Sequence, residues 1–297
     1  MSGLFRSELL RLTSRRLLRV SVLVFLGILL LSQVVAAAQS RPLTEAERAA
    51  VAVAQVEARD AAERCEASRP PELSPAEYSC KTEVDMPRAL YSAHEVLPEL
   101  AKAMATMTAL LAFIIGASYV GADWQTGAMQ ALLFWEPRRG RVVLAKAAAL
   151  AVVLVVVAAV VEALCWGSTL LVAATRGTTE GVTGGLLAST FLTTLRGTGV
   201  VLFAGLAGFA IAGLARVTAA ALGAALGYLL LVELILRGLK PRLADYFVLP
   251  NSSAVVNNGA EGALGTIGGG RGAVTLALYL VLLVGAFYAA FSQRDVS

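Results

Sequence analysis

Few side chains in this sequence could carry out chemistry, since only 15% of its 297 residues are charged. The single histidine, His94, cannot form a metal cluster alone, and we expect it to cap a helix or lie at the surface. No HExxH motif occurs, and the acids within apolar stretches stand singly. An intramembrane enzyme would need a nucleophile with a base, or several metal ligands, at one depth. We therefore predict no catalytic residue and no metal site.

Three charged residues nevertheless lie within or beside long apolar runs: Glu162, Arg196 and Glu233. At about 1.5 Å per helical residue they lie roughly 30, 29 and 24 Å from the inner ends of their runs. One interpretation is a charge cluster that lines the outer exit of a substrate path. The other is that each side chain snorkels to the interface, which their depth near the edge favours.

The densest group of polar, aromatic and basic side chains lies between two apolar runs, in residues 121–146. It contains Asp123, Trp124, Trp135, Glu136, Pro137, Arg138, Arg139, Arg141 and Lys146. Tryptophan suits a membrane interface, proline ends the preceding helix, and the arginines hold the next helix at the lipid surface. These features could simply set topology, or they could form a contact surface for another protein.

The surrounding sequence is that of an all-α membrane protein. Its residues are 57% hydrophobic with a mean hydropathy of +0.72, above the roughly 45–50% apolar share of soluble proteins. A bilayer core needs roughly 20 apolar residues of helix. Six stretches qualify, and we predict transmembrane helices over 20–38, 100–122, 142–175, 186–215, 217–236 and 272–293.

Lys and Arg decide the orientation of these six helices, because they favour the cytoplasmic side of short loops. They gather in residues 1–19 and 123–141, so we predict a multi-pass protein of the cell membrane with both termini in the cytoplasm. The basic residues adjoin apolar runs and form no stripe on a polar domain. We therefore do not expect nucleic acid as a partner.

Residues 1–19 alternate leucines with arginines, which predicts a cytoplasmic amphipathic helix lying in the headgroup layer. Two other interpretations stay open. The arginines could serve only to fix the topology, or the segment could begin a cleaved signal peptide.

Two segments are predicted outside the cytoplasm. Residues 39–99 contain three capping-box patterns, beginning at Thr44, Ser74 and Ser92, and should form an ordered helical loop with a first helix near 44–68. Cys65 and Cys80 both lie there, where thiols oxidise, so we predict a disulfide between them. Cys165 lies within a span and should be a small buried hydrophobic residue. Residues 237–271 are Gly-rich and irregular, which indicates a re-entrant segment.

Residues 121–146, GADWQTGAMQALLFWEPRRGRVVLAK, resemble the loop after the second span in ABC-2 permeases, the membrane subunits of type-2 ABC exporters. The shared features are an acid, a small pair, Leu-Leu, Pro, Arg and Lys. They correspond here to Asp123, Thr126-Gly127, Leu132-Leu133, Pro137, Arg138 or Arg139, and Lys146. Asp123 replaces the usual Glu, and Thr-Gly reverses the usual order.

The resemblance implies that this loop forms a coupling helix that docks on a separate ATP-binding subunit. Its contact residues would be Asp123, Trp124, Thr126, Gly127, Glu136, Pro137, Arg138, Arg139 and Arg141. The sequence contains no GxxxxGK[ST] phosphate loop, so ATP and Mg²⁺ would bind the partner, and this chain would carry no cofactor.

The implied function is that of the permease in an ATP-driven exporter of a lipid-like, amphiphilic or peptide substrate. Two ATP-binding subunits, membrane lipid and a second permease copy, forming a homodimer, would be its partners. The alternative is a non-transporting scaffold or sensor that uses the 39–99 segment to bind a partner outside the cell.

Overall fold

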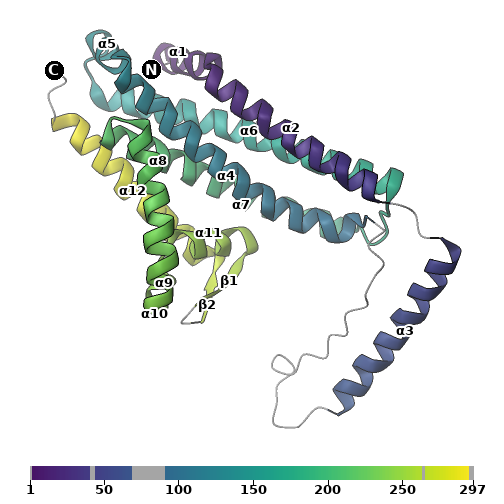
Figure 1. Cartoon of the computed structure of the whole chain (residues 1–297). Helices are drawn as coiled ribbons and strands as arrows, with labels where there is room; N and C mark the ends of the chain where they lie inside the picture. The colour runs from purple at the N-terminus through teal and green to yellow at the C-terminus, as the bar shows by residue number, and fades with distance from the viewer. Residues whose placement is uncertain (1, 41–43, 69–90, 263–264, 294–297) are drawn as a thin grey trace.

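The computed structural model describes residues 2–40, 44–68, 91–262 and 265–293. In chain order its elements are α1 (Ser2–Ser14), α2 (Arg16–Gln39), α3 (Glu45–Ala67), α4 (Ala93–Gln125), α5 (Ala128–Trp135), α6 (Arg139–Arg176), α7 (Gly184–Ala215), α8 (Thr218–Gly227), the π-helix η1 (Tyr228–Leu236), α9 (Arg237–Leu239), α10 (Pro241–Ala244), α11 (Val248–Asn257), β1 (Gly259–Gly262), β2 (Gly265–Gly268) and α12 (Gly269–Gln293). α1, α5 and the last turns of α12 lie at one end of the bundle, called here the α1 end, and α3 lies beyond the other (Figure 1).

Five helices of the described chain are long and apolar enough to cross a membrane: α2, α4, α6, α7 and α12. They correspond to five of the six predicted spans. The sixth, over 217–236, is divided between α8 and the π-helical turns of η1, and its apolar α-helical length is too short to count with the others. A sixth crossing therefore stays a prediction.

α4 and α7 form the tightest contact in the bundle because glycines remove the side chains between them. A Cβ placed on Gly116 would lie 1.9 Å from the carbonyl oxygen of Gly205, and one on Gly208 would lie 2.4 Å from that of Phe113. Small residues let helix backbones approach closely where water does not drive association. Gly208 and Ala212, four residues apart on α7, are both buried.

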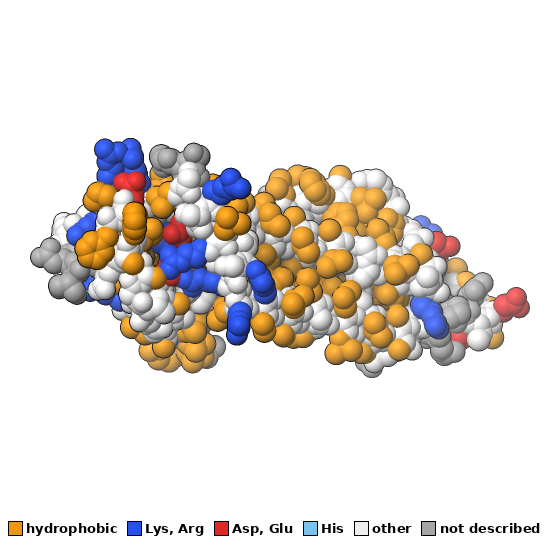
Figure 2. Space-filling view, turned by 90° about the horizontal axis from the view of Figure 1, so that it is seen from above, with side chains coloured by type: hydrophobic (Ala, Val, Ile, Leu, Met, Phe, Trp, Pro, Cys, Tyr) orange, Lys and Arg blue, Asp and Glu red, His pale blue; other side chains and the backbone are white. Residues whose placement is uncertain are grey.

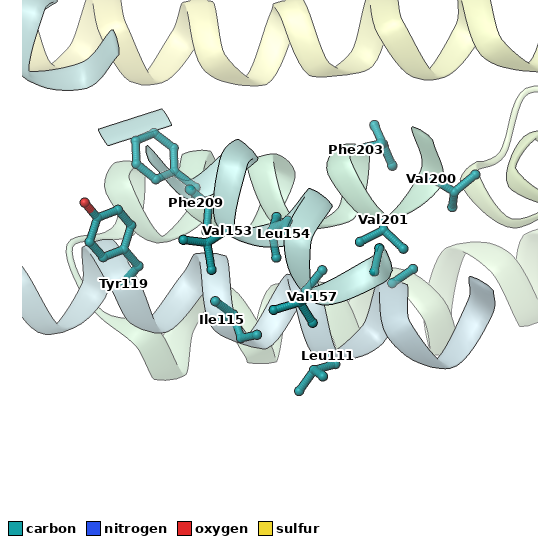
Figure 3. Packing of buried hydrophobic residues seen from close by; sticks show 14 of the residues in the cluster. Leu111, Ile115, Tyr119, Val153, Leu154, Val157, Val200, Val201, Phe203 and Phe209 are labelled. Atoms are coloured by element: carbon teal, nitrogen blue, oxygen red, sulfur yellow. The ribbon is translucent and has the colours of Figure 1, made fainter. Parts of the chain in front are cut away.

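The apolar core lies where α6 packs on this pair. Figure 3 shows Leu111, Ile115 and Tyr119 of α4 beside residues of α6 and α7 such as Leu154 and Phe209. The outer surface is apolar too, and on α2 most of the large hydrophobic side chains are exposed. In Figure 2 the charged side chains lie toward the two ends of the visible face, and a broad hydrophobic band separates them. Such a band suits contact with lipid.

The N-terminal segment differs from its prediction as one amphipathic helix over 1–19. The chain takes an extended conformation at Arg15 (φ −64°, ψ 129°), so α1 ends at Ser14 and Arg16 already begins α2. α1 packs against α6. Because Glu8 and Leu12 are buried there, one face of α1 contacts protein. Its place in the headgroup layer stays a prediction.

At the opposite end, α3 confirms the predicted helix near 44–68. Thr44 accepts a hydrogen bond from the N–H of Glu47, and the Glu47 carboxylate accepts one from the N–H of Thr44, which completes a capping box. The box beginning at Ser74 and the residue Cys80 lie outside the described residues. Ser92 does start α4, but without the predicted side-chain hydrogen bond. Backbone bonds instead join Tyr91 and Ala93 to Thr178, in the loop after α6.

Residues 237–271 are more regular than predicted. They form α9, α10 and α11, and then β1 pairs antiparallel with β2 from Gly259 opposite Gly268 to Gly262 opposite Gly265. This hairpin is the exception to the predicted all-α architecture within the described residues.

Candidate functional site

Three ionisable side chains meet inside the α1 end of the bundle, each from a different helix. Lys146 of α6 places its Nζ 2.7 Å from Glu8 Oε2 of α1 and 2.7 Å from Asp123 Oδ2 of α4. All three side chains are at most 2% exposed. Breaking a buried ion pair by removing one partner typically costs about 3–5 kcal/mol, since it leaves an unpaired charge. This contact therefore holds α1, α4 and α6 together.

Two arginines at the end of α1 complete the arrangement. Arg11 donates to Asp123 Oδ1 at 3.0 Å, and Arg15 pairs with the same oxygen and donates to the carbonyl oxygen of Ser118 at 3.2 Å. We call Glu8, Arg11, Arg15, Asp123 and Lys146 the charge network. Positions 8 and 11 lie on one face of α1 at helical spacing, and Arg15 follows in the extended break between α1 and α2.

Tyr119 of α4 lies at the centre of the charge network. Its hydroxyl donates to Glu8 Oε2 at 2.5 Å, and its ring lies 4.7 Å from Lys146 Nζ and 5.1 Å from the Arg15 guanidinium carbon. An aromatic face attracts cations, most strongly where water is excluded. Tyr119 therefore stabilises one anion of the network, Glu8, and two of its three cations, Arg15 and Lys146.

The loop next to the charge network folds as a short helix, α5. α4 ends at Gln125, and Gly127 takes the left-handed conformation (φ 69°) that turns the chain into α5. Met129 is buried, whereas Phe134 and Trp135 are 88% and 90% exposed. Exposed aromatic side chains beside a turn are typical of a contact surface.

The arginines after α5 divide into two kinds. Arg138 and Arg141 are exposed. Arg139 is half-buried and donates to the carbonyl oxygens of Phe291 and Ser292 at 2.6 and 3.3 Å. Those carbonyls end α12, where a cation is favoured by the helix dipole. Arg139 thus joins the start of α6 to the end of α12.

The remaining predicted contact residues lie at different depths. Trp124 is half-buried between the Phe291 ring, 5.9 Å away edge to face, and the Arg216 guanidinium, 4.6 Å away. Thr126 and Pro137 are exposed, whereas Gly127 and Glu136 are half-buried. Asp123 is 1% exposed, so it acts through the charge network inside this chain.

Sequence reasoning did not assign Glu8, Arg11 or Arg15 of the network to a site, nor Tyr119 at its centre. Glu8 is the one acid among the basic residues of 1–19. An acid on the apolar side of a basic helix could have indicated a buried cation partner. Nothing in the sequence distinguished Tyr119 from the protein's other tyrosines.

The predicted outer charges bind different elements. Glu162 of α6 accepts a hydrogen bond from Thr194 of α7 at 3.4 Å, and Arg196 is half-buried two residues further along. Glu233 Oε1 instead accepts from the N–H of Leu249 at 2.9 Å, and the Tyr228 hydroxyl accepts from the N–H of Val248 at 3.0 Å. Glu233 therefore caps the N-terminus of α11. A shared role in a substrate path stays a prediction.

Cys65, Cys165 and His94 lie away from the charge network. Cys65 is disulfide-bonded, and its predicted partner Cys80 lies outside the described residues, so the pairing stays a prediction. Cys165 is a free, buried thiol, as predicted. His94 contacts the carbonyl oxygen of Gly181 at 2.9 Å. Within the described chain, no three His, Cys, Asp or Glu side chains are grouped to hold a metal ion.

Comparison with known proteins bears on what this arrangement serves. No curated protein matches the chain. A family model described as "ABC-2 family transporter protein" matches residues 8–296, which includes the charge network, α5 and every membrane-span candidate. Because this match covers nearly the whole sequence, the chain belongs to the ABC-2 family of membrane transport proteins.

Proposed function

We propose that this protein is the permease subunit of an ATP-driven exporter, which moves a lipid-like, amphiphilic or peptide substrate out of the cytoplasm or inner leaflet. ABC-2 permeases normally work with an ATP-binding subunit. Two such subunits would bind ATP and Mg²⁺ and hydrolyse the nucleotide, and a second permease copy would complete the complex. α8 and η1 would form the sixth crossing, with both termini in the cytoplasm.

The observation that carries this proposal is the position of α5 beside the charge network. α5 exposes Phe134 and Trp135 at the α1 end, between the end of α4 and the start of α6. Both flanking helices are tied to α1, α4 through the Asp123–Arg11 pair and α6 through the Lys146–Glu8 pair. A force applied to α5 would therefore move α1, α4 and α6 as one body. Such rigid-body movement is a common way to switch a protein between two arrangements.

The exposure of each residue refines the predicted contact with the ATP-binding subunit. The exposed residues Thr126, Pro137, Arg138 and Arg141, with the α5 aromatics, would touch the partner. Aromatic residues and arginine are favoured at protein interfaces. Asp123, Trp124 and Arg139 would act within the chain, since each is bound to another part of the bundle.

Site-directed photo-cross-linking tests the contact in native membranes. A photoreactive phenylalanine analogue at Phe134 should form an adduct that mass spectrometry identifies as an ABC ATP-binding protein. The same analogue at Leu171, an exposed position near the other end of α6, should not. An adduct with the same ATP-binding protein from both positions, or from neither, would contradict the proposal.

Charge reversal tests whether the contact with the ATP-binding subunit is coupled to ATP hydrolysis. In the co-purified complex, Arg138→Glu/Arg141→Glu should reduce ATP hydrolysis at least about tenfold, since two exposed cations would be lost from one interface. Arg176→Glu is the matched control, because Arg176 is exposed at the opposite end of α6. Unchanged association and turnover in the double variant would remove the coupling role.

A scaffold or sensor is the second candidate, and α3 is the observation that favours it. This 23-residue helix extends away from the bundle (Figure 1). A scaffold would lose its partner when α3 is replaced by a flexible linker, and it would be insensitive to the arginine reversals. An exporter would respond in the opposite way.

A further inference from the structure

A pocket of about 320 Å³ opens beside the charge network, where α1 and the first turn of α2 face α4. Its polar wall includes Arg11, Arg15, Arg16 and the Asp123 carboxylate that Arg11 and Arg15 neutralise, and its apolar wall includes Leu17, Leu18 and Ile115. Of the residues proposed to touch the ATP-binding subunit, Thr126 alone lines this pocket. A pocket with one basic wall and one apolar wall suits an amphiphilic anion.

The charge at the pocket favours an anion. The network contains three cations and two anions, so it retains one formal positive charge. Arg16 adds a second, and within the described chain its exposed side chain forms no ion pair. Arginine binds phosphate oxygens through paired N–H donors, which allows Arg16 to hold a phosphate group.

The apolar wall extends toward the middle of the bundle. Ile115 precedes Asp123 by eight residues on α4, which is a rise of about 12 Å along the helix. Leu18 is buried, whereas Leu17 is 50% exposed at the start of a helix whose outer face is apolar. A ligand with its charged group at Arg16 would therefore extend its apolar part toward the hydrophobic band of Figure 2.

We propose that this pocket binds one anionic phospholipid. The phosphate contacts Arg16 at the charged end, and the first part of an acyl chain lies along Leu17, Leu18 and Ile115. Basic pockets between helices at the cytoplasmic membrane surface are suited to acidic headgroups. A soluble phosphate would use the basic wall alone and leave the apolar wall exposed to water.

Native mass spectrometry of the full-length protein tests this assignment. The protein, released from micelles with equal amounts of phosphatidylglycerol and phosphatidylcholine, should retain phosphatidylglycerol selectively. Arg16→Glu should reduce that retention by about tenfold, the size expected for one lost charged contact. Arg16→Lys should keep most of it, and Leu17→Asn should reduce it for both lipids.

Arg19→Glu is the matched control, because Arg19 is exposed one turn away and does not line the pocket. It should leave the retention of phosphatidylglycerol unchanged. Equal losses in Arg16→Glu and Arg19→Glu would show a general surface-charge effect and overturn the proposal. Equal retention of the two lipids would overturn it as well, as would displacement of phosphatidylglycerol by the same concentration of inorganic phosphate.

Discussion

The charge network at the α1 end and the capping contacts of α11 both satisfy buried polar groups, but they join segments at very different sequence separations. Lys146 and Glu8 are 138 residues apart, whereas Glu233 and Leu249 are 16 apart. The network requires α1, α4 and α6 to be packed together, and the cap joins η1 to the helix that soon follows it. Loss of a network residue should thus disturb the bundle, and loss of a cap should disturb only one segment.

The strongest test of this comparison is Lys146→Met. Methionine keeps the length of the side chain but removes the cation between Glu8 and Asp123, so we expect a loss of about 3–5 kcal/mol in the free energy of unfolding. Unfolding by SDS titration in mixed micelles would measure it. Lys102→Met is the control, because the Lys102–Glu99 pair is exposed, and such pairs contribute about 0–1 kcal/mol. Similar losses in the two variants would refute the comparison.

A double-mutant cycle would show whether the network acts as a unit. Glu8→Gln combined with Lys146→Met should give a coupling energy of about 1–3 kcal/mol, because the two side chains are in direct contact. Glu8→Gln combined with Lys102→Met should be additive. Additivity in the first cycle would mean that Glu8 and Lys146 contribute independently.

The cap of α11 should give a smaller and more local effect. Tyr228→Phe removes the hydroxyl that accepts from the N–H of Val248, and a typical hydrogen bond contributes about 1 kcal/mol. Amide hydrogen exchange should speed up at Val248 and remain unchanged in α6. Tyr288→Phe, at a half-exposed position on α12, is the control. Faster exchange throughout the bundle would contradict the local interpretation.

The smallest effect on the bundle should come from Thr44→Ala in α3. The change removes a capping box worth about 1 kcal/mol, but only to a helix that lies outside the bundle. Amide exchange should increase in the first turn of α3, including at Glu47, without any change in the SDS midpoint. A shifted midpoint would show that α3 is coupled to the network after all.

The fold could be predicted where a single stretch of chain decides the outcome. Apolar length identified α2, α4, α6, α7 and α12, and the Thr44–Glu47 spacing identified the start of α3. The predictions were less accurate where the backbone conformation depends on contacts between different segments. The break at Arg15 and the hairpin of β1 and β2 depend on contacts that no local pattern contains.

The sequence contained a candidate site but did not show which of its side chains contact one another. The cluster of residues 121–146 contains Asp123 and Lys146 of the charge network, and the family match includes it. The sequence grouped Asp123 with the surface arginines because they are close along the chain. In the folded protein Asp123 faces inward and Arg138 faces outward.

The sequence by itself determined that this is a helical membrane protein of the ABC-2 family, because hydropathy and the loop residues are properties of continuous segments. Only the tertiary structure decided which charges are buried together. Ion-pair energy depends on distance and exclusion of water. Both are fixed only when α1, α4 and α6 bring Lys146 within 2.7 Å of Asp123 and of Glu8, which is 138 residues away in the sequence.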